Sequence, residues 1–335
     1  MTPRASSSPA PSRRPRPGVR PRLAAAATAA VLAVGVAACG ADDTDGGNGA
    51  SDIAVEAGSL EAAMTVDPGP APDVRLLEPG TGERRVVTYG PSRTPAVVEI
   101  TRSGSSRTVV PGTAPRVDDT PEQVLTVEGG SDPDVDGAQR ATVTVLDFTS
   151  VDEHRAAQFA TATGFTVTWT RGADGAVRQV SLEAPVGATD VARAGVEITA
   201  ATVSDTTVVW PREAIGVGAR WEVTRRVDDA VAPTRVTTYE LTGLEGDVAT
   251  LEHTTTAPDP SPTLTAPGSD GEGGVALDVD AYDVAGRGEL TVDLRSALPV
   301  DGRTESSTRA VYVDPDSGAR TTHDENSVLE FAQAD

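Results

Sequence analysis

Short runs in which apolar and polar residues alternate recur from residue 84 to residue 313. Val and Thr dominate these runs, and Gly, Pro or Asp residues separate them. Successive side chains of a strand point to opposite faces, so a period of two indicates antiparallel sheet with one buried face. We predict strands at 84–89, 96–101, 141–148, 165–170, 177–182, 206–210, 220–226, 235–241, 248–253, 288–294 and 308–313, with hairpin turns at 171–175 and 244–247.

Two segments carry helix signals instead. The first runs from Ser150, whose hydroxyl can cap a helix while Glu153 reaches back to it, as far as Gly164. The second covers 190–203 and has one apolar stripe. The residues of that stripe are Val191, Ala194, Ile198 and Ala201. The sequence therefore predicts a mainly β fold, an antiparallel curved sheet with about two accessory helices.

The two halves of the chain resemble each other. Residues 82–88, Gly-Glu-Arg-Arg-Val-Val-Thr, recur in outline at 218–224 as Gly-Ala-Arg-Trp-Glu-Val-Thr, and similar strands follow each copy. We predict that the halves, 73–203 and 204–331, arose by duplication and that each supplies part of one sheet. Strands rich in Val and Thr also resemble one another by composition, which leaves chance similarity open.

The first 38 residues have the pattern of a cleaved leader. Their charges are six arginines within residues 1–22, and residues 23–38 are uncharged and rich in Ala, Val and Leu. This apolar stretch has the length of a signal-peptide core and is shorter than the ~20 residues of a membrane span. It ends in Val36-Ala37-Ala38-Cys39-Gly40, which is similar to the lipobox of bacterial lipoproteins. We expect cleavage of signal peptide 1–38 before Cys39.

Cys39 is the only cysteine, so it cannot form an internal disulfide. We expect lipid on this thiol to anchor the mature protein to the extracytoplasmic face of the cell membrane. Two export routes remain open: Ser12-Arg13-Arg14 suggests a twin-arginine signal, but Pro15 and Arg16 follow where that signal turns apolar.

The mature chain divides into a tether and a folded domain. Residues 39–72 are rich in Gly, Asp and Pro, and we predict a flexible tether. The β-rich extracytoplasmic domain then covers 73–335. A second stretch of low complexity, 257–274, is expected to form a surface loop within this domain.

The mature chain is also strongly acidic, with 22 arginines against 50 acids and a net charge of −28. Such a chain repels nucleic acid and anionic lipid head groups, so nucleic acid is excluded as a partner. The basic residues are all Arg, and Ala, Gly, Pro and Val are abundant. This composition is typical of a GC-rich genome such as that of an actinobacterium.

One segment carries a family resemblance. Residues 209–223 run Val-Trp-Pro-Arg-Glu-Ala-Ile-Gly-Val-Gly-Ala-Arg-Trp-Glu-Val. This proline-led turn followed by Val-Gly-x-Gly-x-x-Trp resembles the signature of a family of domains of unknown function in secreted lipoproteins of actinobacteria, with Ile215 where Val is usual. Residues 286–302 and Glu78-Pro79-Gly80 are similar to other parts of that family, so the resemblance spans most of 75–331. It implies a secreted lipoprotein and no particular activity.

The signature has two physical interpretations. Gly216 and Gly218 permit turn conformations that other residues avoid, and Trp221 can bury a large apolar area. Both features favour a structural role. The alternative is an aromatic ligand platform made by Trp210 and Trp221.

Catalytic motifs are missing from the sequence. His154, His253 and His323 lack the spacing of zinc sites, there is no Gly-x-Ser-x-Gly elbow, and no Gly-rich phosphate loop follows a strand. We predict no catalytic residue and no cofactor.

One acidic cluster has the spacing of a metal loop. Asp132, Asp134 and Asp136 precede Gly137 as in the first half of a calcium-binding EF-hand. The twelfth position is Val143 where that loop has Glu. A solvated acidic turn and a weak calcium site are the two interpretations.

These observations predict a membrane-anchored lipoprotein with a non-catalytic binding or structural role at the cell envelope and an unidentified envelope partner or ligand. The alternative is a carrier of a lipid or other hydrophobic ligand, similar to mycobacterial lipoproteins that hold acyl chains in a curved half-barrel lined by helices. An envelope enzyme is the third hypothesis. A large apolar cavity would favour the carrier, and a filled core would favour the surface module.

Overall fold

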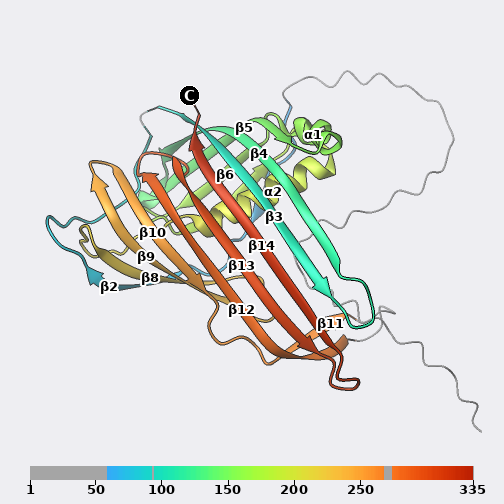
Figure 1. Cartoon of the computed structure of the whole chain (residues 1–335). Helices are drawn as coiled ribbons and strands as arrows, with labels where there is room; N and C mark the ends of the chain where they lie inside the picture. Colours follow the sequence, from blue (N-terminus) through green and yellow to red (C-terminus); the bar gives the residue numbers. More distant parts are fainter. Residues whose placement is uncertain (1–58, 93, 268–273, 335) are drawn as a thin grey trace, which may run out of the picture.

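The computed structural model describes residues 59–92, 94–267 and 274–334, and its fold is mainly β, as the sequence predicts (Figure 1). The strands are β1 (Met64–Val66), β2 (Asp73–Pro79), β3 (Ala96–Val109), β4 (Arg116–Pro133), β5 (Gln139–Ser150), β6 (Thr166–Arg171), β7 (Val177–Glu183), β8 (Ala219–Arg226), β9 (Thr234–Glu245), β10 (Val248–Thr256), β11 (Thr263–Pro267), β12 (Gly274–Asp293), β13 (Asp301–Val313) and β14 (Arg320–Gln333). The helices are α1 (Glu153–Phe159) and α2 (Asp190–Thr206), with short 3-10 turns at Val135–Gly137 and Ala160–Ala162.

All fourteen strands belong to one open antiparallel sheet. Thirteen follow the order β1-β7-β6-β5-β4-β3-β14-β13-β12-β10-β9-β8-β2, and β11 pairs with β12 beside this path. Strands β3 to β7 lie together, and so do β8 to β14, as expected if each predicted half supplies part of one sheet. β2 belongs to the first half but pairs with β8, so the halves are not separate blocks. The duplication itself stays a prediction.

The sheet curves around α2. The hydroxyl of Ser204, near the end of α2, accepts a hydrogen bond from the Trp169 indole on β6 (2.8 Å), and its carbonyl accepts one from Arg225 on β8 (2.9 Å). In the sheet, β6 and β8 are nine strand spacings apart, which is ~43 Å in a flat sheet. Two side chains that meet at one serine cannot bridge that distance. The sheet therefore bends toward α2, and we call the face that carries α2 the inner face and the opposite one the outer face.

α2 packs on the inner face through small side chains. A Cβ atom at Gly195 would lie 2.6 Å from the Phe148 ring, so glycine is required for the helix to come this close to the sheet. The buried positions of α2 are Ala192, Gly195, Val196, Thr199, Ala200 and Val203. The predicted stripe is therefore wrong by about one residue: its members are half-buried, except Ala201, which is exposed. The buried set includes Gly195 and Thr199, which a stripe chosen for hydrophobicity does not select.

The first helix begins two residues later than predicted, because Asp152 and not Ser150 caps it. Asp152 is the N-cap, and its carboxylate accepts hydrogen bonds from the N–H groups of His154 (3.1 Å) and Arg155 (3.4 Å). Ser150 is the last residue of β5, and its hydroxyl donates to the Glu122 carbonyl on β4 (2.9 Å). Ser150, which the local pattern assigned to the helix cap, is therefore used in the pairing of β5 with β4.

Two predicted strands do not form. Residues 84–89 make one isolated bridge, between Arg85 and Ile215, and residues 206–210 are the end of α2 and a loop. Their apolar side chains, among them Val87 and Val208, are buried in the main core. The alternation of apolar and polar residues in these two segments therefore reflects side-chain burial from irregular backbone and not a strand. Five strands were missed in return: β1, β2, β4, β11 and β14. Long parts of β4 and β14 are polar on both faces and lack the alternation that the prediction used.

Two apolar clusters hold the domain together. The main core fills the space between the sheet and the helices and includes Trp210, Trp221 and Phe148. A smaller cluster lies near the far ends of the longest strands and consists of Val231, Leu264, Leu277, Ala310 and Tyr312. Leu264 belongs to β11, so part of the predicted loop 257–274 forms a strand that pairs with β12. Residues 268–273 of that loop lie outside the described residues.

A segment of the predicted tether 39–72 also joins the sheet. Leu60 bridges to Pro185, and β1 pairs with β7 at one edge. The chain then crosses to the other edge, where β2 pairs with β8. The signal peptide, Cys39 and the first part of the tether lie outside the described residues. Within the described ranges, no helix is long and apolar enough to cross a membrane.

Candidate functional site

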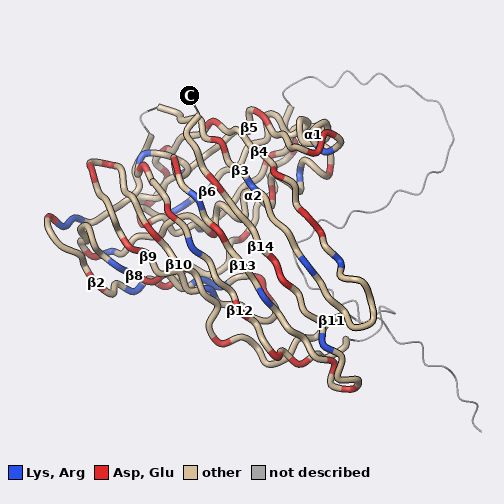
Figure 2. Tube along the Cα trace, in the orientation of Figure 1, with Lys and Arg blue, Asp and Glu red and all other residues tan. Residues whose placement is uncertain are grey.

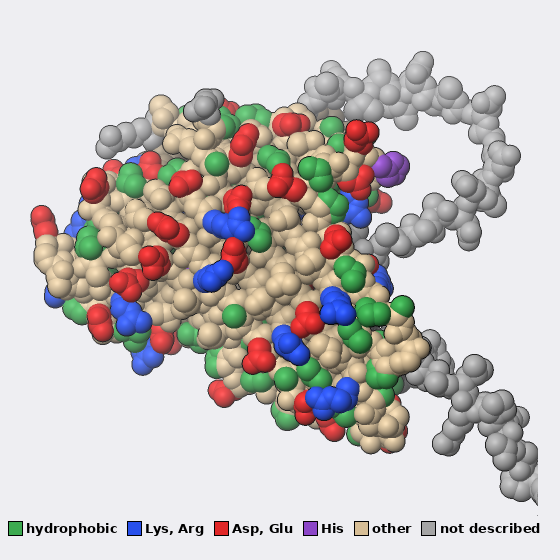
Figure 3. Space-filling view, viewed as in Figure 1, with side chains coloured by type: hydrophobic (Ala, Val, Ile, Leu, Met, Phe, Trp, Pro, Cys, Tyr) green, Lys and Arg blue, Asp and Glu red, His purple; other side chains and the backbone are tan. Residues whose placement is uncertain are grey.

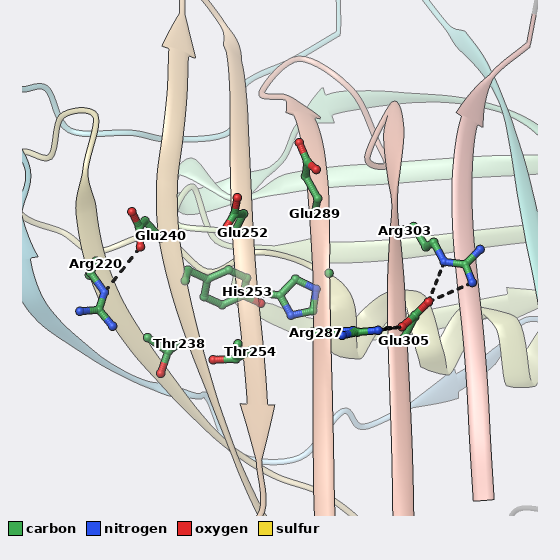
Figure 4. Close-up of a pocket in the computed structure, with 12 residues that line it drawn as sticks. Arg220, Thr238, Glu240, Glu252, His253, Thr254, Arg287, Glu289, Arg303 and Glu305 are labelled. Atoms are coloured by element: carbon green, nitrogen blue, oxygen red, sulfur yellow. Dashed lines mark hydrogen bonds and ion pairs between the residues drawn. The ribbon is translucent and has the colours of Figure 1, made fainter.

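A hollow opens on the outer face, across β8, β9, β10, β12 and β13 (Figure 4). Its volume is about 510 Å³, and charged side chains form most of its walls. The lining residues are Arg220, Thr238, Tyr239, Glu240, Glu252, His253, Thr254, Arg287, Gly288, Glu289, Arg303 and Glu305. We call this hollow the outer groove.

The strand register places charges in a row across the groove. Arg220 is opposite Glu240, Glu240 is opposite Glu252, Glu252 is opposite Glu289, and Glu289 is opposite Arg303. These residues all point to the same face because partners in a ladder share a face. The row therefore carries three neighbouring carboxylates between two guanidinium groups.

Most of the charges on the groove walls are paired. Arg220 lies 3.8 Å from the Glu240 carboxylate, and Glu305 receives both Arg287 (2.8 Å) and Arg303 (3.0 Å). In the described part of the chain, Glu252 and Glu289 have no ion pair or side-chain hydrogen bond. Their mutual repulsion is the one unbalanced electrostatic feature of the row.

A histidine lies beneath the groove, on the inner side of β10. The His253 ring stands 5.8 Å from the Tyr239 ring, and a Cβ atom at Gly288 would lie 2.5 Å from its Nε2 atom. Neither ring nitrogen has a hydrogen-bond partner among the described residues. Burial lowers the pKa of His253 to about 4, so the ring is neutral at pH 7.

A second hollow of about 450 Å³ continues the outer groove toward β14 and β3. It shares Glu289 and Arg303 with the first and adds Glu99 and Glu330. Arg303 also forms an ion pair with Glu330. The outer face is thus a broad polar surface on which acids, arginines and small uncharged side chains alternate (Figures 2 and 3).

Trp210 and Trp221, the alternative ligand platform, are buried in the main core. Their rings are 5.5 Å apart, Trp221 stacks on Tyr239 at 5.4 Å, and its indole donates to the Val209 carbonyl (2.9 Å). The geometry therefore favours the structural interpretation of the signature. Gly216 supports it, because a Cβ atom there would lie 2.5 Å from the Thr81 carbonyl.

Of the acidic cluster, Asp134 and Asp136 lie in the turn between β4 and β5, and Asp132 lies near the end of β4. The Asp134 carboxylate caps this turn by accepting from the Val135 N–H (2.8 Å), and it pairs with Arg140 (3.4 Å). In the ranges that the structure covers, no three His, Cys, Asp or Glu side chains are grouped to hold a metal ion. Asp134 therefore has a capping role, and calcium binding stays a prediction.

The remaining predicted residues are separate from the groove. His154 lies on α1, and His323 lies on β14, where Nδ1 is 2.9 Å from the Thr108 hydroxyl. Cys39 lies outside the described residues. No protein-family model matches the chain, and no curated protein matches its sequence. The resemblance to a family of actinobacterial lipoproteins therefore stays a prediction.

Sequence reasoning missed the outer groove. Its side chains come from five strands, and only the register brings positions such as 220, 252 and 303 into one row. The available signal was the recurrence of charges two residues apart, as at 287 and 289 or 303 and 305. That signal marks an exposed strand face, but it does not say which strands are neighbours.

Proposed function

We propose that the protein is a lipid-anchored extracytoplasmic lipoprotein that has a non-catalytic binding or structural role at the cell envelope. The arginine-rich leader, its apolar stretch and the lipobox ending at Cys39 support the anchor. The folded domain meets its partner through the outer face, which carries the outer groove.

The chemistry of the groove is the main support for a role in binding. Its arginines are paired with glutamates, and Thr238 and Thr254 add hydroxyl groups to its lining. His253 is half-buried on the inner side of β10, and its lowered pKa makes it a weak base. A set of charged and hydrogen-bonding groups without a nucleophile and its base fits recognition of a partner better than a reaction.

The packing of the inner face also favours this function over the lipid carrier. A carrier needs an apolar cavity of several hundred Å³ to enclose an acyl chain. Here α2 lies against the sheet, and Phe148, Phe159 and Val196 are almost fully buried where such a cavity would be. The stacked rings of Phe148 and Phe159, 4.1 Å apart, fill the space beside α1.

Replacement of the anchoring cysteine tests the proposal. We expect Cys39→Ala to abolish incorporation of labelled palmitate and to move the protein from the membrane fraction to the medium, or to leave an uncleaved precursor. The conservative variant Gly40→Ala is the matched control and should be labelled like the natural chain. Unchanged labelling of Cys39→Ala would contradict the lipoprotein proposal.

A further inference from the structure

The two edges of the sheet are protected differently. β2, at one edge, carries Asp73, Arg75 and Glu78 and ends at Pro79, and Arg75 pairs with Glu222 on β8. Charges and proline are the usual means by which an edge strand avoids association. β1, at the other edge, consists of Met-Thr-Val and has none of these.

β1 and its neighbour loop expose four large apolar side chains, which we call the β1 rim. They are Leu60, Met64, Val66 and Val186, and between 40% and 47% of each is exposed. Leu60 bridges to Pro185, and the Val186 N–H donates to the Ser59 carbonyl (2.9 Å), so the loop and the strand lie side by side. Such an apolar edge marks an interaction surface.

The backbone of the rim is held in place. Arg193 on α2 donates to both oxygens of the Glu61 carboxylate, at 2.5 and 2.7 Å. This bidentate pair fixes the segment just before β1 against the helix. It also neutralises Glu61, so the rim presents apolar side chains without a free charge from that residue.

The position of the β1 rim in the chain indicates what contacts it. Ser59, where the described chain begins, is twenty residues after Cys39. A flexible chain of that length spans ~25 Å on average and at most ~70 Å. If Cys39 carries lipid, the rim is within reach of the bilayer surface. A second copy is a poorer occupant, because two mature chains of charge −28 repel each other.

We infer that the β1 rim rests on the bilayer surface and orients the tethered domain, with the outer groove directed away from β1. The inference depends on the proposed lipid anchor. Val186 and Met64 enter the interfacial region of zwitterionic lipid, where apolar side chains leave water while the strand stays paired with β7. The β9–β10 turn lies on the far side of the molecule from the point where the described chain begins (Figure 1).

A single-cysteine fluorescence experiment tests the orientation. Acylation blocks Cys39, so Val186→Cys provides the only free thiol of the mature, lipidated chain. We would attach an environment-sensitive dye and reconstitute the protein in phosphatidylcholine vesicles that contain a nitroxide-labelled lipid. We expect the Val186 dye to lose most of its emission. Glu245→Cys, on the β9–β10 turn, is the control and should keep its emission; Ala63→Cys gives a second reporter beside the rim.

The possible failures are distinguishable. If the protein floats with the vesicles but the dyes at 186 and 63 are not quenched, the anchor stands and the orientation is wrong. If the protein does not float at all, the lipid anchor is wrong and the orientation falls with it. If the rim dyes are shielded in a cross-linkable dimer without lipid, a second copy covers the rim and the inference is overturned.

Discussion

The domain has two regions that use the same sheet in different ways. In the body, where the sheet is backed by α1 and α2, one face is buried against the main core. In the wing, the far ends of β12, β13, β14, β3 and β4 extend past the helices (Figure 1). Here the sheet is covered only at its end, by the small cluster around Tyr312 and Leu264.

Between the two clusters the wing is polar on both faces. Residues 103–107, 305–309 and 325–328 are neighbours in the sheet and consist mostly of Ser, Thr, Arg and acids, all exposed or half-buried. Strands of this composition are joined by backbone hydrogen bonds and gain little from side-chain burial. We therefore expect the domain to differ in local stability along one continuous sheet.

The largest expected effects come from apolar side chains in the two regions. We expect Trp221→Ala to lower the free energy of global unfolding by about 3–5 kcal/mol, because it removes a fully buried indole from the main core. Tyr312→Ala should instead accelerate amide hydrogen exchange in the wing while the body stays protected. Denaturant unfolding and hydrogen-exchange mass spectrometry distinguish these outcomes. An equal loss of global stability in both variants would contradict the division into two regions.

The next effect concerns His253, at the boundary of the body. Its pKa falls from an ordinary value of about 6.5 to about 4 on burial, so the unfolded chain binds a proton more readily than the folded one. Its contribution to stability is therefore complete above pH 6.5 and is lost as the pH falls toward 4, by up to about 3 kcal/mol. We expect His253→Met to flatten this part of the pH profile of unfolding. His154→Gln, an exposed change on α1, should leave the profile as it is; an unchanged profile in His253→Met would contradict the assignment.

A smaller effect is expected at Asp229, in the segment that covers the wing cluster. Burial alone would raise the pKa of this carboxyl, but hydrogen bonds from Tyr282 (2.5 Å), Arg235 (2.7 Å) and two backbone N–H groups lower it below its ordinary value. This contribution is present above the unfolded pKa of about 3.9 and is lost as the pH falls through the lower folded value. Asp229→Asn should therefore loosen residues 227–233 at neutral pH, as hydrogen exchange would show. Equal protection of residues 227–233 in the natural chain and in Asp229→Asn at neutral pH would contradict a stabilising role of the Asp229 hydrogen bonds.

The smallest effect tests the unbalanced pair of the outer groove. Glu252→Gln removes the middle one of three carboxylates that stand side by side in the row, and we expect a gain of about 0.2–1 kcal/mol in stability. Glu330→Gln is the matched control, because it breaks the ion pair with Arg303 but has no carboxylate opposite it, so it brings no such gain. High salt should reduce the gain, since it screens exposed charges. A loss of stability in Glu252→Gln would mean that this carboxylate has a partner.

The sequence predicted the body better than the wing. Where a strand buries one face, as β5 does with Val143 and Val145, apolar and polar residues alternate and the strand is recognisable. The wing segments of β4 and β14 bury little, so composition alone could not separate them from loops. The helix stripe failed for a related reason: Gly195 and Ala200 face the sheet because they are small, which a hydrophobic pattern does not register.

The candidate site was less predictable than the fold. The roles of Trp210 and Trp221 followed from their size and rarity, and their burial agrees with the structural interpretation. The outer groove depends on which strands are neighbours, and β2 beside β8 or β3 beside β14 are pairings that no local pattern encodes.

In this description the chain itself fills the inner face, and the tethered domain acts through its outer surface. The most direct measurement compares the native and the denatured mass of the mature protein extracted from membranes. We predict that the two masses are equal and correspond to the chain from Cys39 with its covalent acyl groups. A native mass that exceeds the denatured mass by one acyl lipid per chain would contradict the claim and establish the carrier.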